Sequence, residues 1–312
     1  MQTCPGLSRI GRVASQRRGR AVSEWFKLAR PFSLTAAAVP VVFGTALASE
    51  DGNFSWGPFV AMFLGSLLIQ AATNMFNEFY DEKRGLDVTG AVGIAGSIVG
   101  RRMRARSVLL GALFCYVLAL VCGIYLIVVG GWPILVLGCL SALGGYLYSA
   151  GPRPIAYTPA SEAAVFVFMG ILIVVIAYAV QGAGFPTYVA LAALPLGGPV
   201  AAILLANNLR DLVSDRRGGR RTLPIVLGRE FGVLVYRLLI LEPYVAVGIL
   251  MAFDVVPLTC ALVYPSIFAA GRLWKDIATH TSPRRLDPVV KRTAGLHLAF
   301  GLLYTAGILL GG

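Results

Sequence analysis

Long apolar stretches alternate with short polar ones along almost the whole chain. Nine of them approach the length of about 20 residues that a helix needs to cross the hydrocarbon core of a membrane. They lie at residues 34–49, 57–79, 107–129, 132–149, 162–180, 188–208, 231–252, 256–270 and 293–310. The pattern predicts an all-α polytopic membrane protein with about nine transmembrane helices.

The composition agrees with a protein that resides in a lipid bilayer. Hydrophobic residues make up 57% of the chain and charged residues only 13%, and the mean hydropathy is +0.76. Soluble domains carry about 25% charged residues. The chain is therefore expected to be an integral membrane protein rather than a soluble one.

Positive charges are distributed in a way that predicts an orientation. The net charge is +12, but every Lys and Arg except Arg237 falls in the N-terminal tail or in alternate loops, and the other loops contain only acids such as Asp254. This is the positive-inside pattern of membrane proteins. It predicts a cytoplasmic N-terminus and an outer C-terminus, and it argues against a nucleic-acid partner. We expect the membrane to be a bacterial inner membrane.

The first residues differ from the rest of the chain. Residues 1–23 are basic and contain no acid. We expect residues 1–27 to form a floppy cytoplasmic tail, although the composition also fits a transit peptide. Residues 28–312 are expected to form one transmembrane domain.

A first polar cluster closes the second apolar stretch. Asn74, Asn77 and Asp81 recur every three or four residues, so they share one face of a helix. Asp87 lies off that face, but Gly85 allows the chain to turn and bring it back. The cluster opens into a long basic loop.

A second cluster closes the sixth apolar stretch in the same way. Asp211 and Asp215 are four residues apart, and Asn207 extends the same helical face. This cluster also opens into a long basic loop. The weak duplication suggests two similar helical halves around a central cavity.

Carboxylates at membrane depth are costly and therefore functional candidates. Hard oxygen ligands suit Mg²⁺, which usually carries substrate phosphates. The clusters thus predict a Mg²⁺ site whose metal neutralises a diphosphate leaving group. A competing interpretation pairs each acid with a neighbouring Arg as a surface ion pair. The predicted metal ligands are Asn77, Asp81, Asp87, Asp211 and Asp215, and the four Asp residues are also the predicted catalytic residues.

Other polar residues near the clusters are candidates for substrate binding. Arg153 is the only cation in the proline-rich turn between the fourth and fifth stretches, and could reach an anionic acceptor or a phosphate. A purely structural turn is equally compatible with the sequence. The cations nearer the acids could hold departing phosphate oxygens. The full set is Asn74, Asn77, Lys83, Arg84, Arg153, Asn207, Asn208, Arg210, Arg220 and Arg221.

At these motifs the chain resembles the UbiA superfamily of intramembrane prenyltransferases. The resemblance covers residues 28–310 and rests on Asn-x-x-x-Asp at Asn77–Asp81 and Asp-x-x-x-Asp at Asp211–Asp215. The fuller segments around both motifs resemble the branch that prenylates 1,4-dihydroxy-2-naphthoate. The resemblance implies transfer of a polyprenyl group from polyprenyl diphosphate to that aromatic acceptor, with loss of the acceptor carboxylate, in menaquinone biosynthesis.

Three other functions remain compatible with the same site. The acceptor could be 4-hydroxybenzoate, another phenol or a glycerol phosphate. The prenyl cation could instead be cyclised without an acceptor. A non-catalytic transporter is a different class, but its acids are expected inside the spans and on broken helices.

Overall fold

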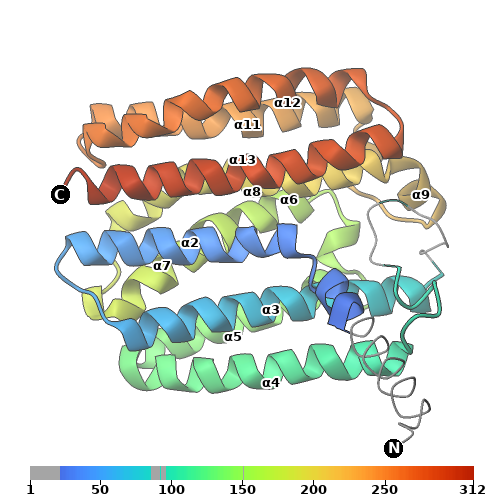
Figure 1. Cartoon of the computed structure of the whole chain (residues 1–312), viewed down its shortest axis with the longest axis horizontal. Coiled ribbons are helices and arrows are strands. Elements are labelled where there is room, and N and C mark those ends of the chain that lie inside the picture. Colours follow the sequence, from blue (N-terminus) through green and yellow to red (C-terminus); the bar gives the residue numbers. More distant parts are fainter. Residues whose placement is uncertain (1–21, 86–91, 93–95, 150) are drawn as a thin grey trace, which may run out of the picture.

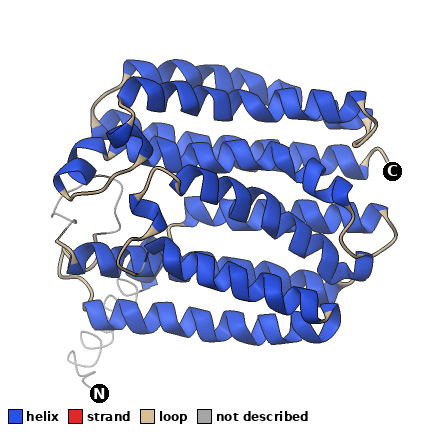
Figure 2. Ribbon diagram, turned by 180° about the vertical axis from the view of Figure 1, so that it is seen from behind, coloured by secondary structure: helices blue, strands red, loops and turns tan. Residues whose placement is uncertain are grey.

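The computed structural model of the chain describes residues 22–85, 92, 96–149 and 151–312. These residues form helices and connecting loops, with no strand among them (Figures 1 and 2). Residues 1–21 and Asp87 lie outside the described part. The longer helices are α2 (Pro31–Glu50), α3 (Trp56–Lys83), α4 (Ala105–Gly130), α5 (Trp132–Ser149), α8 (Thr187–Arg210), α11 (Arg229–Ala252), α12 (Ile267–Thr279) and α13 (Pro283–Leu309).

Shorter elements complete the path of the chain. The segment Ser161–Ala183 is one helical path made of α6 (Ser161–Val165), the π-helical η2 (Phe166–Leu172), α7 (Ile173–Tyr178) and η3 (Ala179–Ala183). Connections near the acid clusters contain η1 (Ile155–Tyr157), α9 (Leu212–Arg217) and α10 (Leu223–Val226). The 3₁₀ segment η4 (Leu258–Ser266) leads directly into α12.

Among the described residues, seven helices are long and apolar enough to cross a membrane. They are α2, α3, α4, α5, the path from α6 to η3, α8 and α11. The chain is an integral membrane protein, as its composition predicts. The η4–α12 segment and α13 fall outside this set, and α13 carries Arg284, Arg285 and Asp287 in its first turns. The count of nine spans therefore stays a prediction.

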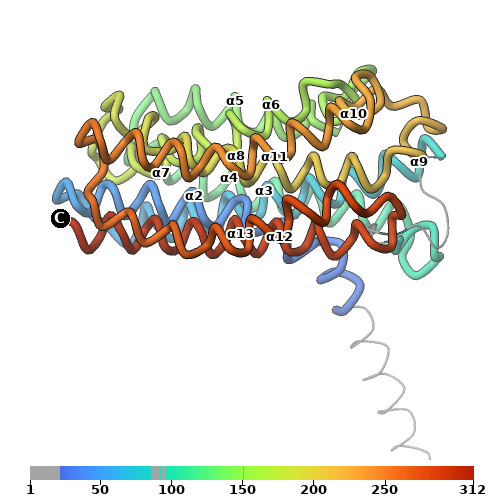
Figure 3. Tube along the Cα trace, turned by 90° about the horizontal axis from the view of Figure 1, so that it is seen from above, coloured from blue at the N-terminus to red at the C-terminus, as the bar shows by residue number. Residues whose placement is uncertain are grey.

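Helix α8 is the central element of the bundle. Of the residues in its most apolar window 78% are buried, against 17% in α4 and 11% in α5. It contacts α11, α13 and η2; Figure 3 shows α8 beside α11. A Cβ added to Gly170 of η2 would lie 2.4 Å from Cα of Gly197 in α8. Only glycine allows the two backbones to approach so closely, and such close packing drives helix association in lipid.

The main core lies where α8 meets its neighbours. Fully buried side chains there include Phe43 of α2, Tyr236 and Ile240 of α11 and Phe300 of α13. Helices α4 and α5 instead present many apolar side chains on the outside, such as Val128 and Leu143. An apolar outer surface is what a bilayer requires, so these two helices are the ones most open to lipid.

Residues 22–29 are helical rather than floppy. Glu24 is buried and accepts hydrogen bonds from Lys27, Ser97 and Arg102, each at 2.8 Å. Burial alone would raise the pKa of Glu24, but these hydrogen bonds, led by that from Arg102, lower it to about 2. This contact ties the start of the described chain to the segment after α3. The division of the sequence into tail and membrane domain stays a prediction.

Candidate active site

A cavity of about 890 Å³ lies between the two acid clusters and the helices below them. Its walls come from α2, α3, α4, α5, α8 and the path from α6 to α7. One part is polar and carries Asp81, Asp211 and Asp215, whereas the other is lined by side chains such as Met62, Leu126, Phe168 and Ile173. The cavity therefore combines an acidic end with an apolar wall.

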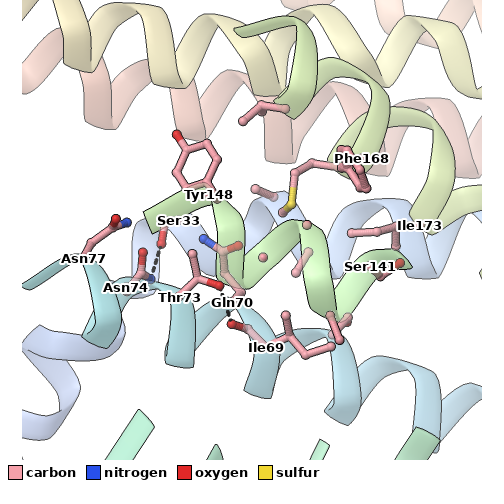
Figure 4. A pocket seen from close by; sticks show the side chains of 18 of the residues that line it. Ser33, Ile69, Gln70, Thr73, Asn74, Asn77, Ser141, Tyr148, Phe168 and Ile173 are labelled. Atoms are coloured by element: carbon pink, nitrogen blue, oxygen red, sulfur yellow. Dashed lines mark hydrogen bonds between the residues drawn. The ribbon is translucent and has the colours of Figure 1, made fainter. Parts of the chain in front are cut away.

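The first cluster lies on an uninterrupted helix. Helix α3 continues to Lys83, and Gly85 then adopts φ +70°, as expected for a turn that only glycine adopts easily. Asn74, Asn77 and Asp81 all line the cavity, and Figure 4 shows the two amides on one face of α3. Both amides have protein partners, which are Ala29 O and Ser33 Oγ for Asn74, each at 2.8 Å, and Ser149 Oγ for Asn77.

Asp81 is held by residues from distant parts of the chain. One carboxylate oxygen accepts a hydrogen bond from the hydroxyl group of Tyr157, in the turn between α5 and α6. The other lies 2.6 Å from Nη2 of Arg220, in the loop after α9. The side chain of Asp81 is 16% exposed, so its charge is only partly solvated. It is therefore already paired with a cation where a metal was expected.

The second cluster lies on a broken helix, which corrects the expectation of one continuous face. Helix α8 ends at Arg210 and α9 begins at Leu212, with Asp211 between them at φ −95° and ψ 7°. The Arg210 guanidinium binds both oxygens of Asp211, at 2.8 and 2.6 Å, at this break. The amide of Asp215 still donates to the carbonyl of Asp211 at 2.8 Å. The spacing of four thus survives the break, and both acids line the cavity.

Arg210 is buried between two carboxylates. Its third hydrogen bond goes to Asp287 of α13 at 3.0 Å, and its side chain is 2% exposed. A guanidinium so occupied has few donors left for phosphate. For Asp211, the alternative interpretation as an ion pair with the neighbouring Arg therefore describes the structure, although the partner is buried rather than on the surface.

Arg220 connects the two clusters. Its Nη1 lies 3.2 Å from Asp215, while Nη2 binds Asp81. Asp215 is 7% exposed. Burial raises the pKa of Asp215, and the negative charges of Asp211 and Asp81 raise it further. The positive charge of Arg220 opposes this rise, and the resulting pKa is about 7. The two carboxylates raise the pKa of Arg220 above its usual value, so it stays charged.

The residues at this end fit a divalent cation in their chemistry. The positive charge of Arg220 lies between Asp81 and Asp215, where a bound cation would lie. Asp215 Oδ2 and Asn207 Oδ1 are buried and have no hydrogen-bond partner. These are hard oxygen donors of the kind that Mg²⁺ prefers. No group of three His, Cys, Asp or Glu side chains is close enough to hold a metal within the described residues. Asp87, the remaining predicted ligand, lies outside them.

The other predicted cations do not converge on the acids. Arg84 donates to Ser149 O at 3.2 Å and to Gly151 O at 3.0 Å, which fastens the proline-rich turn to the end of α3. Lys83, Arg153 and Arg221 are exposed. None of these four residues lines the cavity. The position of Arg153 favours the structural interpretation of its turn over a contact with the acceptor.

Two residues that sequence reasoning did not select contribute to the site. Glu162 is buried and accepts hydrogen bonds from Asn208 at 2.8 Å and from Ser161 at 2.9 Å, so it orients an amide at the cavity wall. Tyr157 contacts Asp81, and its burial together with the Asp81 charge raises its pKa to about 12. The distant partners Asn208 and Asp81 lie 46 and 76 positions away, so no local spacing reveals these contacts. The proline-rich segment that contains Tyr157 and leads into α6 was the only available signal.

The family and the fold are known from similar proteins. The UbiA prenyltransferase family matches residues 37–307. The chain is 35% identical over 301 residues to 1,4-dihydroxy-2-naphthoate octaprenyltransferase of Bacillus subtilis (strain 168), covering 96% of each chain. It is 30% identical over 315 residues to the human UbiA prenyltransferase domain-containing protein 1, covering 98% of this chain and 88% of the human protein.

Solved structures share the arrangement of helices. A UbiA homologue from Archaeoglobus fulgidus, bound to DMAPP and Mg²⁺, matches with a TM-score of 0.61 at 18% identity, over 91% of this chain and 99% of that one. A UbiA homologue from Aeropyrum pernix K1, without ligand, matches with a TM-score of 0.66 at 15% identity, over 88% and 97%. The family match spans most of the chain, and the two curated relatives match nearly all of it. This protein belongs to the UbiA prenyltransferase family.

Proposed function

We propose that the protein transfers a polyprenyl group from polyprenyl diphosphate to 1,4-dihydroxy-2-naphthoate, in menaquinone biosynthesis. One observation carries the proposal: two acid clusters meet at Arg220 at the polar end of a largely apolar cavity. The Bacillus subtilis relative carries the name of this activity at 35% identity. Family membership makes the chain a prenyltransferase, and this relative favours the naphthoate acceptor.

The acids would hold the diphosphate through Mg²⁺. Among the described residues, Asp81, Asp215 and Asn207 would supply oxygens to the metal at the polar end, and Asp87 is a further predicted ligand. The two other predicted ligands also line the cavity, but Asn77 accepts a hydrogen bond from Ser149, and Arg210 binds both oxygens of Asp211. Bound Mg²⁺ neutralises charge that develops on a departing diphosphate. Arg220 would bind the phosphate oxygens, because its guanidinium lies between the two acids and keeps its charge.

The apolar wall would hold the prenyl chain next to this site. Leu113, Val117 and Leu120 of α4 line the cavity, and all three side chains are exposed. A polyprenyl chain is therefore surrounded by apolar side chains close to the lipid-facing side of the protein. The aromatic acceptor would stand beside the first prenyl carbon, where the cavity excludes bulk water from the allylic cation.

The orientation follows from the basic loops. We place the acid clusters on the cytoplasmic side of a bacterial inner membrane, because Lys and Arg gather in the loops at that end of the bundle. The bacterial relative supports the choice of membrane. A reporter fused after Gly312 is expected to report an outer location, and activity of a strictly cytoplasmic reporter there would contradict the orientation.

Product analysis tests the activity. The purified protein is incubated with Mg²⁺, a mixture of prenyl diphosphates of different lengths and one acceptor at a time: 1,4-dihydroxy-2-naphthoate, 4-hydroxybenzoate or glycerol phosphate. Mass spectrometry is expected to find a prenylated naphthalene that has lost the acceptor carboxylate, and no product after chelation of divalent cations. Transfer only to another acceptor, or full turnover without divalent cations, would overturn the proposal.

A further inference from the structure

Tyr157 contacts Asp81 of the first acid cluster and the loop that follows the second cluster. It lies at the end of η1, in the turn between α5 and α6. Its hydroxyl group donates a hydrogen bond to Asp81 on the first cluster. Its backbone carbonyl accepts a hydrogen bond from the amide of Arg221, in the loop of the second cluster, at 2.9 Å. One residue therefore joins the two clusters through different atoms.

The Tyr157 ring also holds the cation between the acids. The guanidinium carbon of Arg220 lies 4.5 Å from the ring centroid, and that of Arg84 lies 5.0 Å from it. Such cation–π contacts orient a guanidinium as well as attract it. Because Arg220 also binds Asp81 and Asp215, the ring helps to fix the position of the group that spans them.

The hydroxyl group of Tyr157 is itself held in place. Arg84 donates a hydrogen bond to it at 3.0 Å while also binding the carbonyls of Ser149 and Gly151. The chain of donors runs from Arg84 through Tyr157 to Asp81, so each bond polarises the next. The turn is thus fastened to α3, and the second oxygen of Asp81 faces Arg220.

We propose that Tyr157 is a positioning residue for the diphosphate site, which orients Asp81 through its hydroxyl group and Arg220 through its ring. Arg220 lies between Asp81 and Asp215 and on the Tyr157 ring. With a metal-bound diphosphate in the site, the two carboxylates would hold the metal, and Arg220 would bind phosphate oxygens from its place on the ring. The inference rests on the proposed use of this site for a metal-bound diphosphate, but not on the identity of the acceptor.

Two substitutions separate the roles of the hydroxyl group and the ring. Tyr157→Phe removes the hydrogen bond to Asp81 and keeps the ring, whereas Tyr157→Leu removes both. Tyr264→Phe is the matched control, because it removes a tyrosine hydroxyl that donates to Tyr244 O at 3.1 Å in the core between α11 and η4, outside the cavity lining. The melting temperature of each variant shows whether the fold is kept.

The first measurement is binding of Mn²⁺ alone, followed by electron paramagnetic resonance, which needs neither prenyl donor nor acceptor. Loss of a group that orients a metal ligand typically costs about 10- to 100-fold in affinity. We expect a loss of this order in Tyr157→Phe and no change in Tyr264→Phe. Unchanged Mn²⁺ affinity in Tyr157→Phe would overturn the positioning of Asp81.

The second measurement separates the two substrates by steady-state kinetics. The KM for prenyl diphosphate is expected to rise in Tyr157→Phe and to rise further in Tyr157→Leu, because only the latter frees Arg220, while the KM for the acceptor stays constant. A rise confined to the acceptor would overturn the proposal and place Tyr157 in the acceptor site. If the wild-type protein makes no naphthoate product, the Mn²⁺ titration still decides the role of Tyr157, so the two failures are distinguishable.

Discussion

The two acid clusters reach the cavity on helices that end in different ways. Helix α3 runs unbroken through Asn77 and Asp81, so its polar groups form one stripe along the cavity. Helix α8 breaks at Asp211, and the carboxylate at the break is bound by the buried Arg210. Only Asp215, one turn further, is shared with the first cluster through Arg220. Similar sequence motifs therefore supply one acid each to the pair that Arg220 connects, whereas Asp211 is bound by Arg210 at the helix break.

Substitution of the two shared acids should produce the largest effect. Asp81→Asn and Asp215→Asn each remove a charge from the place where diphosphate would be held, so we expect kcat to fall on the order of 10²- to 10³-fold. Both variants are expected to fold, because Arg220 keeps the other acid as its partner. Single-turnover release of diphosphate measures the step directly.

The double variant tests whether the clusters act together. Residues that act as a unit are strongly non-additive, so combining Asp81→Asn with Asp215→Asn should add little to either single loss. Losses that multiply would show that the clusters work independently. Substantial prenyl transfer by the Asp81→Asn variant at normal expression would rule out the two-cluster mechanism.

Asp211→Asn is expected to affect stability more than catalysis. The substitution leaves the buried Arg210 with Asp287 as its only carboxylate partner, and a lost charged hydrogen bond of this kind costs about 1.5–3 kcal/mol. The melting temperature should therefore fall below that of Asp215→Asn, while kcat should fall by less. The opposite ranking of the two variants in both measurements would contradict the division of roles.

Binding of a divalent cation should depend on pH because of Asp215. Its raised pKa of about 7 means that the carboxyl group is largely protonated below pH 7, so a metal must displace a proton. Mn²⁺ affinity should rise with pH by up to about tenfold per unit below pH 7 and level off above about pH 8, since one proton is released. Removing the nearby charge with Asp81→Asn should move this profile to lower pH. A flat profile from pH 6 to pH 8 would exclude the coupling.

Arg153→Ala should have the smallest effect. Arg153 is exposed and does not line the cavity, so neither KM should change by more than about twofold, the range of a typical surface substitution within ±0.5 kcal/mol. Arg220→Ala is the comparison from the connected clusters and should raise the KM for prenyl diphosphate. A selective rise in the acceptor KM of Arg153→Ala would restore the interpretation of the turn as part of the acceptor site.

Sequence patterns were most informative where a local period was enough. The helical face of Asn74, Asn77 and Asp81 follows from spacing alone, and so does the turn at Gly85. The break at Asp211 could not be predicted, because it goes with a buried pair whose second acid, Asp287, is 77 positions from Arg210. Each acid was expected to face a metal. The sequence does not reveal which of them pair with an Arg side chain in the folded protein, as Asp81 and Asp215 do with Arg220.

The same reasoning explains the turn between α5 and α6. Its prolines indicate a shaped loop, and Arg153 was the natural candidate because charge is visible in a sequence. The residue that contacts Asp81 is Tyr157, and its neighbours are Arg84 at the end of α3 and Arg220 in the loop after α9. An aromatic residue in an apolar protein carries no signal of its own, so its role depends on the assembled fold.

The burial of α8 has a consequence for the order in which the protein is made. Helices α4 and α5 have most of their surface outside the bundle and can rest in lipid as soon as they are synthesised. Helix α8 follows them along the chain, yet it is the most buried of the candidate spans. Independently stable helices associate after insertion. The helices made before α8 would therefore be in the bilayer before the helix that packs at the centre of the bundle. A chain that stops before residue 187 would lack both α8 and the second acid cluster, which follows α8.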